Sequence, residues 1–269
     1  MMRSARILLF DSGMGGLTVA RAVADRLPRA ELIYCADSAG FPYGAWEEVN
    51  LIERILHIVG LAIAKSLPDL CVIACNTAST IAISQLREIF PIPFVGTVPA
   101  IKPAAAQTQS GVIGVLATPA TVKREYTHAL IRAHAANAKV HLYGALGLAA
   151  MAEAKLLGQE VDLAALAQEI TPVFCEAEGK RTDCVVLGCT HYPLLLEEMR
   201  EIAPWPVTFF DPAPAIARRV QDVLSREVRV SQGPAPPIEA GTAFFTDEKG
   251  AQALAAYGPL FTRAEILSV

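Results

Sequence analysis

The chain has 269 residues, of which 53% are hydrophobic, and it carries a formal net charge of −4. A chain of this length can bury a full core, and its apolar content argues against disorder. No apolar run reaches the roughly 18 to 20 residues of a membrane helix, and the start lacks the apolar stretch of a signal peptide. Lysines and arginines are scattered, unlike the basic stripe of a nucleic-acid-binding protein. We therefore expect a cytoplasmic globular protein with no membrane or nucleic-acid partner.

Short apolar stretches alternate with longer amphipathic ones, the pattern of a parallel sheet with helices on both faces. Strands are predicted at residues 6–10, 31–35, 70–74, 94–95, 111–116, 139–142, 184–187 and 207–210. Helices are predicted at residues 17–27, 47–65, 78–90, 120–134, 162–178, 194–202 and 213–226. Near the end, a proline-rich surface loop at 230–240 is followed by a strand at 243–246 and a helix at 249–256.

One strand–turn–helix unit occurs twice in the sequence, and each copy ends its strand on a cysteine. The run DLCVIAC at 69–75 corresponds to DCVVLGC at 183–189. Downstream, REIFPIP at 87–93 corresponds to REIAPWP at 200–206, and PAI occurs at both 99–101 and 214–216. The duplication predicts two similar halves that face each other, with Cys75 and Cys189 on opposite sides of one cleft.

The repeat also suggests where the chain passes between domains. The proline-rich segments at 96–103 and 205–214 are equivalent positions of the two copies. We therefore predict one domain from residues 1–97 plus 208–269 and a second domain from residues 98–207.

Polar clusters follow the predicted strands, where an open α/β sheet carries its chemistry. They are Asp11-Ser12-Gly13, Cys75-Asn76-Thr77, residues 118–121 and Cys189-Thr190-His191. The other cysteines, Cys35, Cys71, Cys175 and Cys184, are interpreted as small buried hydrophobic residues.

Three other interpretations of these motifs stay open. The glycine-rich turn at 11–16 could bind a phosphate, although Thr18 stands where a dinucleotide loop has its third glycine. A metal site of Cys75, Cys189 and His191 is possible, whereas Cys71 and Cys75, roughly 13 Å apart along a strand, cannot share one zinc ion. A single nucleophilic Cys189 with His191 is a third possibility, but it leaves Cys75 without a role.

The two-thiol interpretation uses every motif. A thiol can act as a base when ionised and as an acid when neutral, and the N-terminus of a following helix favours the thiolate. Two opposed groups of this kind are what inversion of a stereocentre requires. Asp11 and His191 are the nearest polar residues that could move protons on and off the thiols.

With these motifs, the chain resembles the glutamate racemases of the cofactor-independent aspartate/glutamate racemase superfamily. The matching segments share their order and span about residues 7 to 215. They are FDSGMGGLTV at 10–19, PYG at 42–44, ACNTAS at 74–79, TVK at 121–123 and GCTHYPL at 188–194.

The resemblance implies two flavodoxin-like α/β domains with parallel sheets, related by a pseudo-twofold axis, with the active site at their interface. It implies interconversion of L- and D-glutamate without cofactor or metal, which supplies D-glutamate for peptidoglycan. Cys75 would take the α-proton of D-glutamate and Cys189 that of L-glutamate, assisted by Asp11 and His191 respectively. The residues implied to hold the substrate are Ser12, Pro42, Tyr43, Gly44, Asn76, Thr77, Thr121 and Thr190, with Glu153 as a further acid.

Two segments depart from the family pattern. Residues 143–152 lack its Cys-Pro start and its Val-Pro-Leu before the acid, and Pro212 follows Asp211 where a serine is common. Beyond the substrate, the resemblance implies a homodimer or monomer and a cell-wall precursor as an allosteric ligand. The alternatives are an aspartate racemase, where Ser79 tends to be replaced by histidine, and a non-catalytic protein that binds DNA gyrase.

Overall fold

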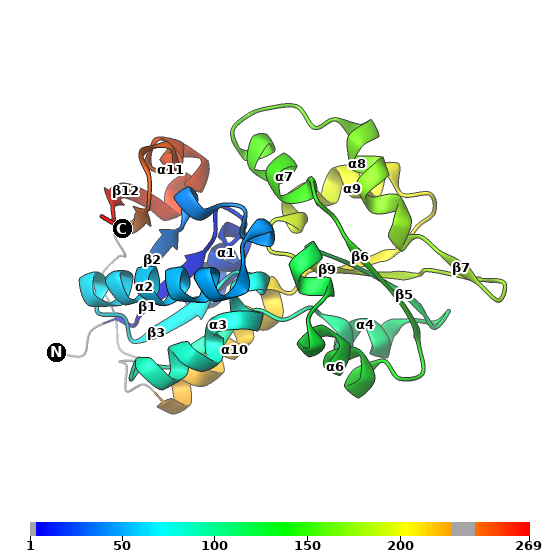
Figure 1. Cartoon of the computed structure of the whole chain (residues 1–269), viewed down its shortest axis with the longest axis horizontal. Coiled ribbons are helices and arrows are strands. Elements are labelled where there is room, and N and C mark those ends of the chain that lie inside the picture. Colours follow the sequence, from blue (N-terminus) through cyan, green and yellow to red (C-terminus); the bar gives the residue numbers. More distant parts are fainter. Residues whose placement is uncertain (1–3, 228–239) are drawn as a thin grey trace. The chain divides into compact units, whose positions relative to one another are not determined.

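The computed structural model describes residues 4–227 and 240–269 and divides into two compact units (Figure 1). The first unit comprises Met1–Thr97 and Ala213–Val269, and the second comprises Val98–Pro212. Each has a mainly parallel sheet with helices, so the predicted α/β fold class is confirmed. In the two described ranges, no helix is long and apolar enough to cross a membrane. Apart from its last residue, the loop predicted at 230–240 lies outside the described residues.

Within its described residues, the first unit contains a six-stranded sheet of order β12-β11-β2-β1-β3-β4 with parallel pairings throughout. Its central strands are apolar along nearly their whole length because both faces are covered. The strands are β1 (Arg6–Asp11), β2 (Glu31–Ala36), β3 (Leu70–Ile73), β4 (Phe94–Gly96), β11 (Gly241–Phe245) and β12 (Phe261–Ile266).

Helices cover the two faces of this sheet. On one face α2 and α3 pack on alternate residues of β1, β2 and β3, and α2 crosses in front of these strands in Figure 1. On the other face α1 and α10 pack against each other. The helices are α1 (Leu17–Arg26), η1 (Ser38–Gly40), η2 (Tyr43–Ala45), α2 (Glu48–Ser66), α3 (Asn76–Ile89), α10 (Ala213–Glu227), α11 (Glu248–Gln252) and η5 (Ala253–Leu260), the η elements being 3₁₀ helices.

The second unit has a four-stranded parallel sheet of order β10-β9-β5-β6 and a short antiparallel hairpin. Its core is divided between the two faces of the sheet. The strands are β5 (Val112–Ala117), β6 (Lys139–Gly144), β7 (Glu176–Ala177), β8 (Lys180–Arg181), β9 (Cys184–Gly188) and β10 (Thr208–Phe210).

The helices of the second unit are shorter than predicted. The helix expected at 162–178 ends at Ile170, because Pro172 cannot donate the backbone hydrogen bond that would continue it. The hairpin β7–β8 occupies the rest of that stretch. The helices are α4 (Ile101–Gln107), α5 (Pro119–Val122), α6 (Glu125–His134), α7 (Leu148–Leu156), α8 (Leu163–Ile170), η3 (Thr171–Val173), η4 (Tyr192–Leu195) and α9 (Leu196–Ile202).

The sequence repeat corresponds to a repeated strand order. The order β2-β1-β3-β4 in the first unit matches β6-β5-β9-β10 in the second, and β11 and β12 extend the first sheet at its β2 side. One difference from the expected division concerns the second crossing. Residues 208–210 were placed in the first domain, but β10 pairs with β9, so these residues belong to the second sheet.

Candidate active site

The first candidate thiol lies at the carboxyl end of β3. Cys75 has extended backbone angles and is the N-cap residue of α3. The unpaired N–H groups at the start of a helix stabilise an adjacent negative charge, which favours the thiolate form of a cysteine there. The Cys75 thiol also donates a hydrogen bond to Ser12 Oγ across 3.7 Å. The structure thus brings together two residues that lie 63 positions apart in the sequence.

Asp11 ends the neighbouring strand β1, and its side chain is fully buried. Its Oδ2 accepts hydrogen bonds from the amides of Gly16 (2.9 Å) and Gly13 (3.3 Å) and from the hydroxyl of Tyr34 (3.4 Å). A Cβ at Gly16 would lie 2.7 Å from the Tyr34 hydroxyl, so this close approach requires glycine. The glycine-rich turn therefore wraps around the chain's own aspartate, and this explains the turn without a bound phosphate.

The first turn of α3 contributes two more predicted residues. Asn76 and Thr77 follow Cys75 directly, and both are buried. In the described part of the chain, neither Nδ2 nor Oδ1 of Asn76 has a hydrogen-bond partner. A buried amide in that state costs free energy, which is typical of a group that binds a ligand.

The predicted binding residues Pro42, Tyr43 and Gly44 lie in the connection between β2 and α2. The Tyr43 hydroxyl donates a hydrogen bond to Asp37 Oδ2 at 2.6 Å. Burial raises the pKa of Tyr43, and the negative charge of Asp37 raises it further. Tyr43 is therefore a neutral phenol whose hydroxyl is directed to Asp37, while Pro42 and Gly44 are exposed.

The second candidate thiol occupies the corresponding place after β9. Cys189 is followed by the 3₁₀ helix η4, and α9 begins only after η4. His191, not the cysteine, is the N-cap residue of η4. Cys75 is thus the N-cap residue of an α-helix, whereas Cys189 is not.

A histidine and a carboxylate form a chain beside Cys189. The Cys189 Sγ lies 3.8 Å from His191 Nδ1, and His191 Nε2 lies 3.0 Å from Glu153 Oε1. The hydrogen bond to the carboxylate fixes the orientation of the imidazole and sets which ring nitrogen carries the proton. The histidine can therefore exchange a proton with the thiol at its other nitrogen. Glu153 comes from α7, so the predicted acid is brought to the predicted histidine across 38 positions.

Two residues that the sequence did not single out hold α7 in place. Lys155 Nζ donates to the carbonyl oxygen of Leu194 at 2.8 Å and pairs with Glu198. Glu169 accepts hydrogen bonds from the amides of Leu146 (3.0 Å) and Gly147 (2.8 Å) just before the helix. These partners are 22 to 43 positions apart, and no local pattern signals such pairs.

The two remaining predicted residues of the second unit are threonines. Thr121 lies in α5, and its hydroxyl is 2.9 Å from that of Thr118, which also accepts the Thr121 amide. Thr127 donates to the Thr121 carbonyl oxygen at 2.7 Å. Thr190 is buried between Cys189 and His191 in the chain. Thr121 is thus held firmly at the carboxyl edge of the second sheet.

Three other cysteines behave as packing residues. Burial raises the pKa of the Cys35 and Cys71 thiols well above the ordinary value. Burial and the nearby charge of Asp183 raise the pKa of Cys184 to about 12. These thiols remain neutral at physiological pH, in agreement with their interpretation as small buried hydrophobic residues. The same expectation is wrong for Cys175, which is only partly buried and whose thiol donates a hydrogen bond to the Pro172 carbonyl oxygen at 3.3 Å.

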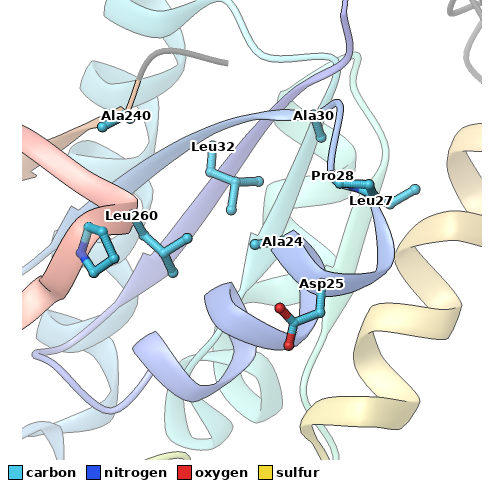
Figure 2. Close-up of a pocket in the computed structure, with 10 residues that line it drawn as sticks. Ala24, Asp25, Leu27, Pro28, Ala30, Leu32, Ala240 and Leu260 are labelled. Carbon is cyan, nitrogen blue, oxygen red and sulfur yellow. The ribbon is translucent and has the colours of Figure 1, made fainter. Parts of the chain in front are cut away.

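A surface pocket of about 260 Å³ lies at the amino edge of the first sheet, opposite to the carboxyl edge where Asp11 and Cys75 lie. It is lined by the end of α1, the start of β2 and the C-terminal segment, with Leu27, Leu32 and Leu260 among its apolar side chains (Figure 2). Among the described residues that line it, Asp25 is the acidic one. None of its lining residues is a predicted site residue, so it is separate from the carboxyl-edge groups.

Known proteins similar to this chain are racemases. Residues 17–220 match the Asp/Glu/Hydantoin racemase family. A glutamate racemase of Brucella canis is 55% identical over 219 residues, which cover 81% of this chain and 79% of that protein.

Solved structures agree with this result. The crystal structure of Escherichia coli glutamate racemase in complex with L-glutamate and the activator UDP-MurNAc-Ala has a TM-score of 0.89 and 40% identity, covering 99% of each chain. Glutamate racemase from Thermus thermophilus in complex with β-chloro-D-alanine has a TM-score of 0.77 and 27% identity, covering 99% of this chain and 98% of that one. The paired thiol motifs, the matching folds and the extent of the sequence match establish that the chain belongs to the Asp/Glu/Hydantoin racemase family.

Proposed function

We propose that this protein is a glutamate racemase that interconverts L- and D-glutamate by a two-thiol proton transfer without a cofactor. The observation that carries the proposal is the pair of cysteines at equivalent ends of two repeated units, each with an acid–base partner. The identity with glutamate racemases over most of the chain supports glutamate as the substrate.

In the proposed mechanism, one thiol acts as a base and the other as an acid. With D-glutamate, the Cys75 thiolate takes the α-proton, and the electron pair of the broken C–H bond moves into the α-carboxylate. The Cys189 thiol then donates its proton to the opposite face of the α-carbon, which gives L-glutamate. The reverse reaction begins with the Cys189 thiolate and ends with the Cys75 thiol.

The side chains beside each sulfur support its return to the starting state. After one turnover, the first thiol carries a proton and the second has lost one. His191, oriented by Glu153, can supply a proton to Cys189 or remove one from it. Asp11 serves the corresponding function near Cys75, and Ser12, one of the proposed substrate-binding residues, contacts the same sulfur.

The greater energetic problem is the weak acidity of the α-hydrogen. Negative charge develops on the α-carboxylate during proton removal, and preorganised hydrogen-bond donors stabilise it. One such donor contributes about 3 to 4 kcal/mol in a well-studied oxyanion hole. We assign this role to Asn76, Thr77 and Thr190, with Thr121 and the Pro42–Gly44 segment holding the rest of the substrate. The unpaired amide of buried Asn76 supports this assignment.

We further propose that the D-glutamate is produced in the cytoplasm for peptidoglycan, and that a cell-wall precursor stimulates the enzyme. The structure of the E. coli relative contains the activator UDP-MurNAc-Ala together with L-glutamate. Racemisation rates measured with and without this compound test the regulatory part independently of the basal reaction.

Incubation of the purified protein with L-glutamate in D₂O, without added cofactor, tests the main proposal. The expected product is D-glutamate with deuterium at the α-carbon, detected by chiral chromatography and mass spectrometry. A parallel incubation with L-aspartate separates glutamate specificity from aspartate racemisation. Absence of both α-exchange and inversion with glutamate would contradict the proposal.

A further inference from the structure

A buried ionic cluster in the first unit is hydrogen-bonded to Tyr43 of the Pro42–Gly44 segment. Its centre is Asp37, which follows β2 directly and is completely buried. The Asp37 carboxylate accepts hydrogen bonds from the Tyr43 hydroxyl (2.6 Å) and the Thr246 hydroxyl (2.8 Å). The guanidinium of Arg54 donates two more, from Nε to Oδ2 at 2.7 Å and from Nη2 to Oδ1 at 2.6 Å. The proposed mechanism uses neither Asp37 nor Arg54.

The cluster connects segments that are distant in sequence. Arg54 lies on α2, and its guanidinium also packs over the ring of Trp46. Trp46 in turn donates a hydrogen bond to the Gly40 carbonyl oxygen at 2.9 Å. Thr246 follows β11, and its hydroxyl also accepts the Ala39 amide at 2.9 Å. The connection between β2 and α2 is therefore held by contacts with α2 through Arg54 and with the residue after β11 through Thr246.

The same cluster is joined to the residues around Cys75. The Asp37 amide donates to the Asp11 carbonyl oxygen at 2.9 Å. The Tyr43 ring packs 6.5 Å from that of Phe10, and η2 contacts α3, the helix that Cys75 caps. Burial and Asp37 raise the pKa of Tyr43 most, and Cys75 is near enough that its sulfur, when ionised, raises that pKa further. The position of the Pro42–Gly44 segment relative to the thiol therefore depends on Asp37.

We propose that Asp37 is a positioning residue for catalysis: through Tyr43, Arg54 and Thr246, it holds the Pro42–Gly44 segment in its substrate-binding conformation. This inference rests on the proposed glutamate racemase function. It also gives the C-terminal strand β11, which has no counterpart in the second unit's sheet, a role in supporting the binding segment.

The test compares Asp37→Asn with Asp69→Asn in the full-length protein. Both carboxylates accept hydrogen bonds in the first unit, but Asp69 receives the Arg6 amide at the amino edge of the sheet. A segment that binds substrate and transition state alike affects KM more than kcat. Asp37→Asn is expected to raise KM for glutamate at least tenfold with kcat changed less than about threefold. Asp69→Asn is expected to leave KM unchanged.

Two milder variants keep the test decisive if Asp37→Asn does not fold. Tyr43→Phe removes one hydrogen bond and keeps the ring, and Thr246→Val removes another. Each is expected to raise KM two- to fivefold at nearly constant kcat, with thermal midpoints recorded for every variant.

An unchanged KM in Asp37→Asn, or in both milder variants, with a lowered thermal midpoint would reduce the cluster to a structural role and overturn the inference. A wild-type protein that does not racemise glutamate would instead contradict the proposed function. The two failures are therefore distinguishable.

Discussion

The two units carry their cysteines on the same strand order, but they surround the sulfurs with different chemistry. In the first unit, Cys75 has Ser12 at 3.7 Å, and Asp11 lies on the adjacent strand. In the second, Cys189 has His191 at 3.8 Å, with Glu153 behind the imidazole. The carboxylate of Asp11 and the hydroxyl of Ser12 in the first unit thus take the place of the His191 imidazole in the second.

Sheet register shows which positions of the two copies correspond. Phe10 pairs with Ile73 in the first sheet, and Leu116 pairs with Leu187 in the second. Counting one residue onward, Asp11 corresponds to Ala117.

Counting from the cysteines in the same way, His191 corresponds to Thr77. Each unit therefore has one proposed acid–base partner, and it stands at a different position of the repeat: at the end of the first strand in one unit and after the third strand in the other.

This arrangement teaches that the fold preserves the places of the thiols more strictly than those of their partners. A partner need only lie within proton-transfer distance of the sulfur, and several positions at the carboxyl edge of a parallel sheet satisfy this.

The largest expected effect comes from removing either thiol. Cys75→Ser and Cys189→Ser should each reduce racemisation at least about 10³-fold, within the range for a positioned acid–base group. The remaining thiol should still remove and return a proton on its own face. In D₂O, Cys189→Ser should therefore exchange the α-hydrogen of D-glutamate faster than that of L-glutamate, and Cys75→Ser should show the opposite preference, as NMR can measure. The reverse preference would contradict the assignment of faces.

A smaller effect is expected when each partner is exchanged for the residue of the other repeat. Asp11→Ala and His191→Thr should each lower kcat/KM about 10²-fold, at the lower end of acid–base contributions. The equilibrium constant of racemisation is 1, so kcat/KM must fall equally in both directions. The difference between the units should instead appear in isotope effects with α-deuterated substrate.

Slower proton transfer at Cys75 should raise the isotope effect for D-glutamate in Asp11→Ala. His191→Thr should raise it for L-glutamate, and Glu153→Gln should do so to a lesser extent. Equal isotope effects in both directions for every variant would show that the partners do not serve separate thiols.

The smallest effect concerns stability in acid. Asp183 opens the second copy of the repeat and receives hydrogen bonds from Thr108, Gln109 and Ser110. Burial opposes its ionisation, but these hydrogen bonds lower its pKa from 3.8 to about 2. A carboxylate whose pKa is lower in the folded than in the unfolded protein stabilises the fold above about pH 4, and this stabilisation is lost as pH falls toward 2.

At pH 6, the free energy of unfolding of the wild type should therefore exceed that of Asp183→Asn by about 1 kcal/mol or less, because solvent screens this partly exposed carboxylate. The difference should disappear near pH 2, as urea titrations at several pH values can measure. A constant difference from pH 6 to pH 2 would show that Asp183 is not ionised in the way described.

The sequence by itself determined the fold class, the repeat and most strand positions. Strands of buried parallel sheets are short apolar runs, and the polar groups that follow them lie at one edge. For this reason, DSG at 11–13, CNT at 75–77 and CTH at 189–191 could be recognised before their contacts were known.

Only the tertiary structure decided which of these residues meet and what holds them. The His191–Glu153 pair, the Lys155 contacts and the Asp37 cluster join residues that lie 6 to 209 positions apart. Such contacts depend on how helices pack on the sheet, and that packing leaves no periodic signal in the chain. Pro172, by contrast, is visible in the sequence as a residue that interrupts helices. Only the structure shows that α8 ends just before it and that the hairpin β7–β8 follows.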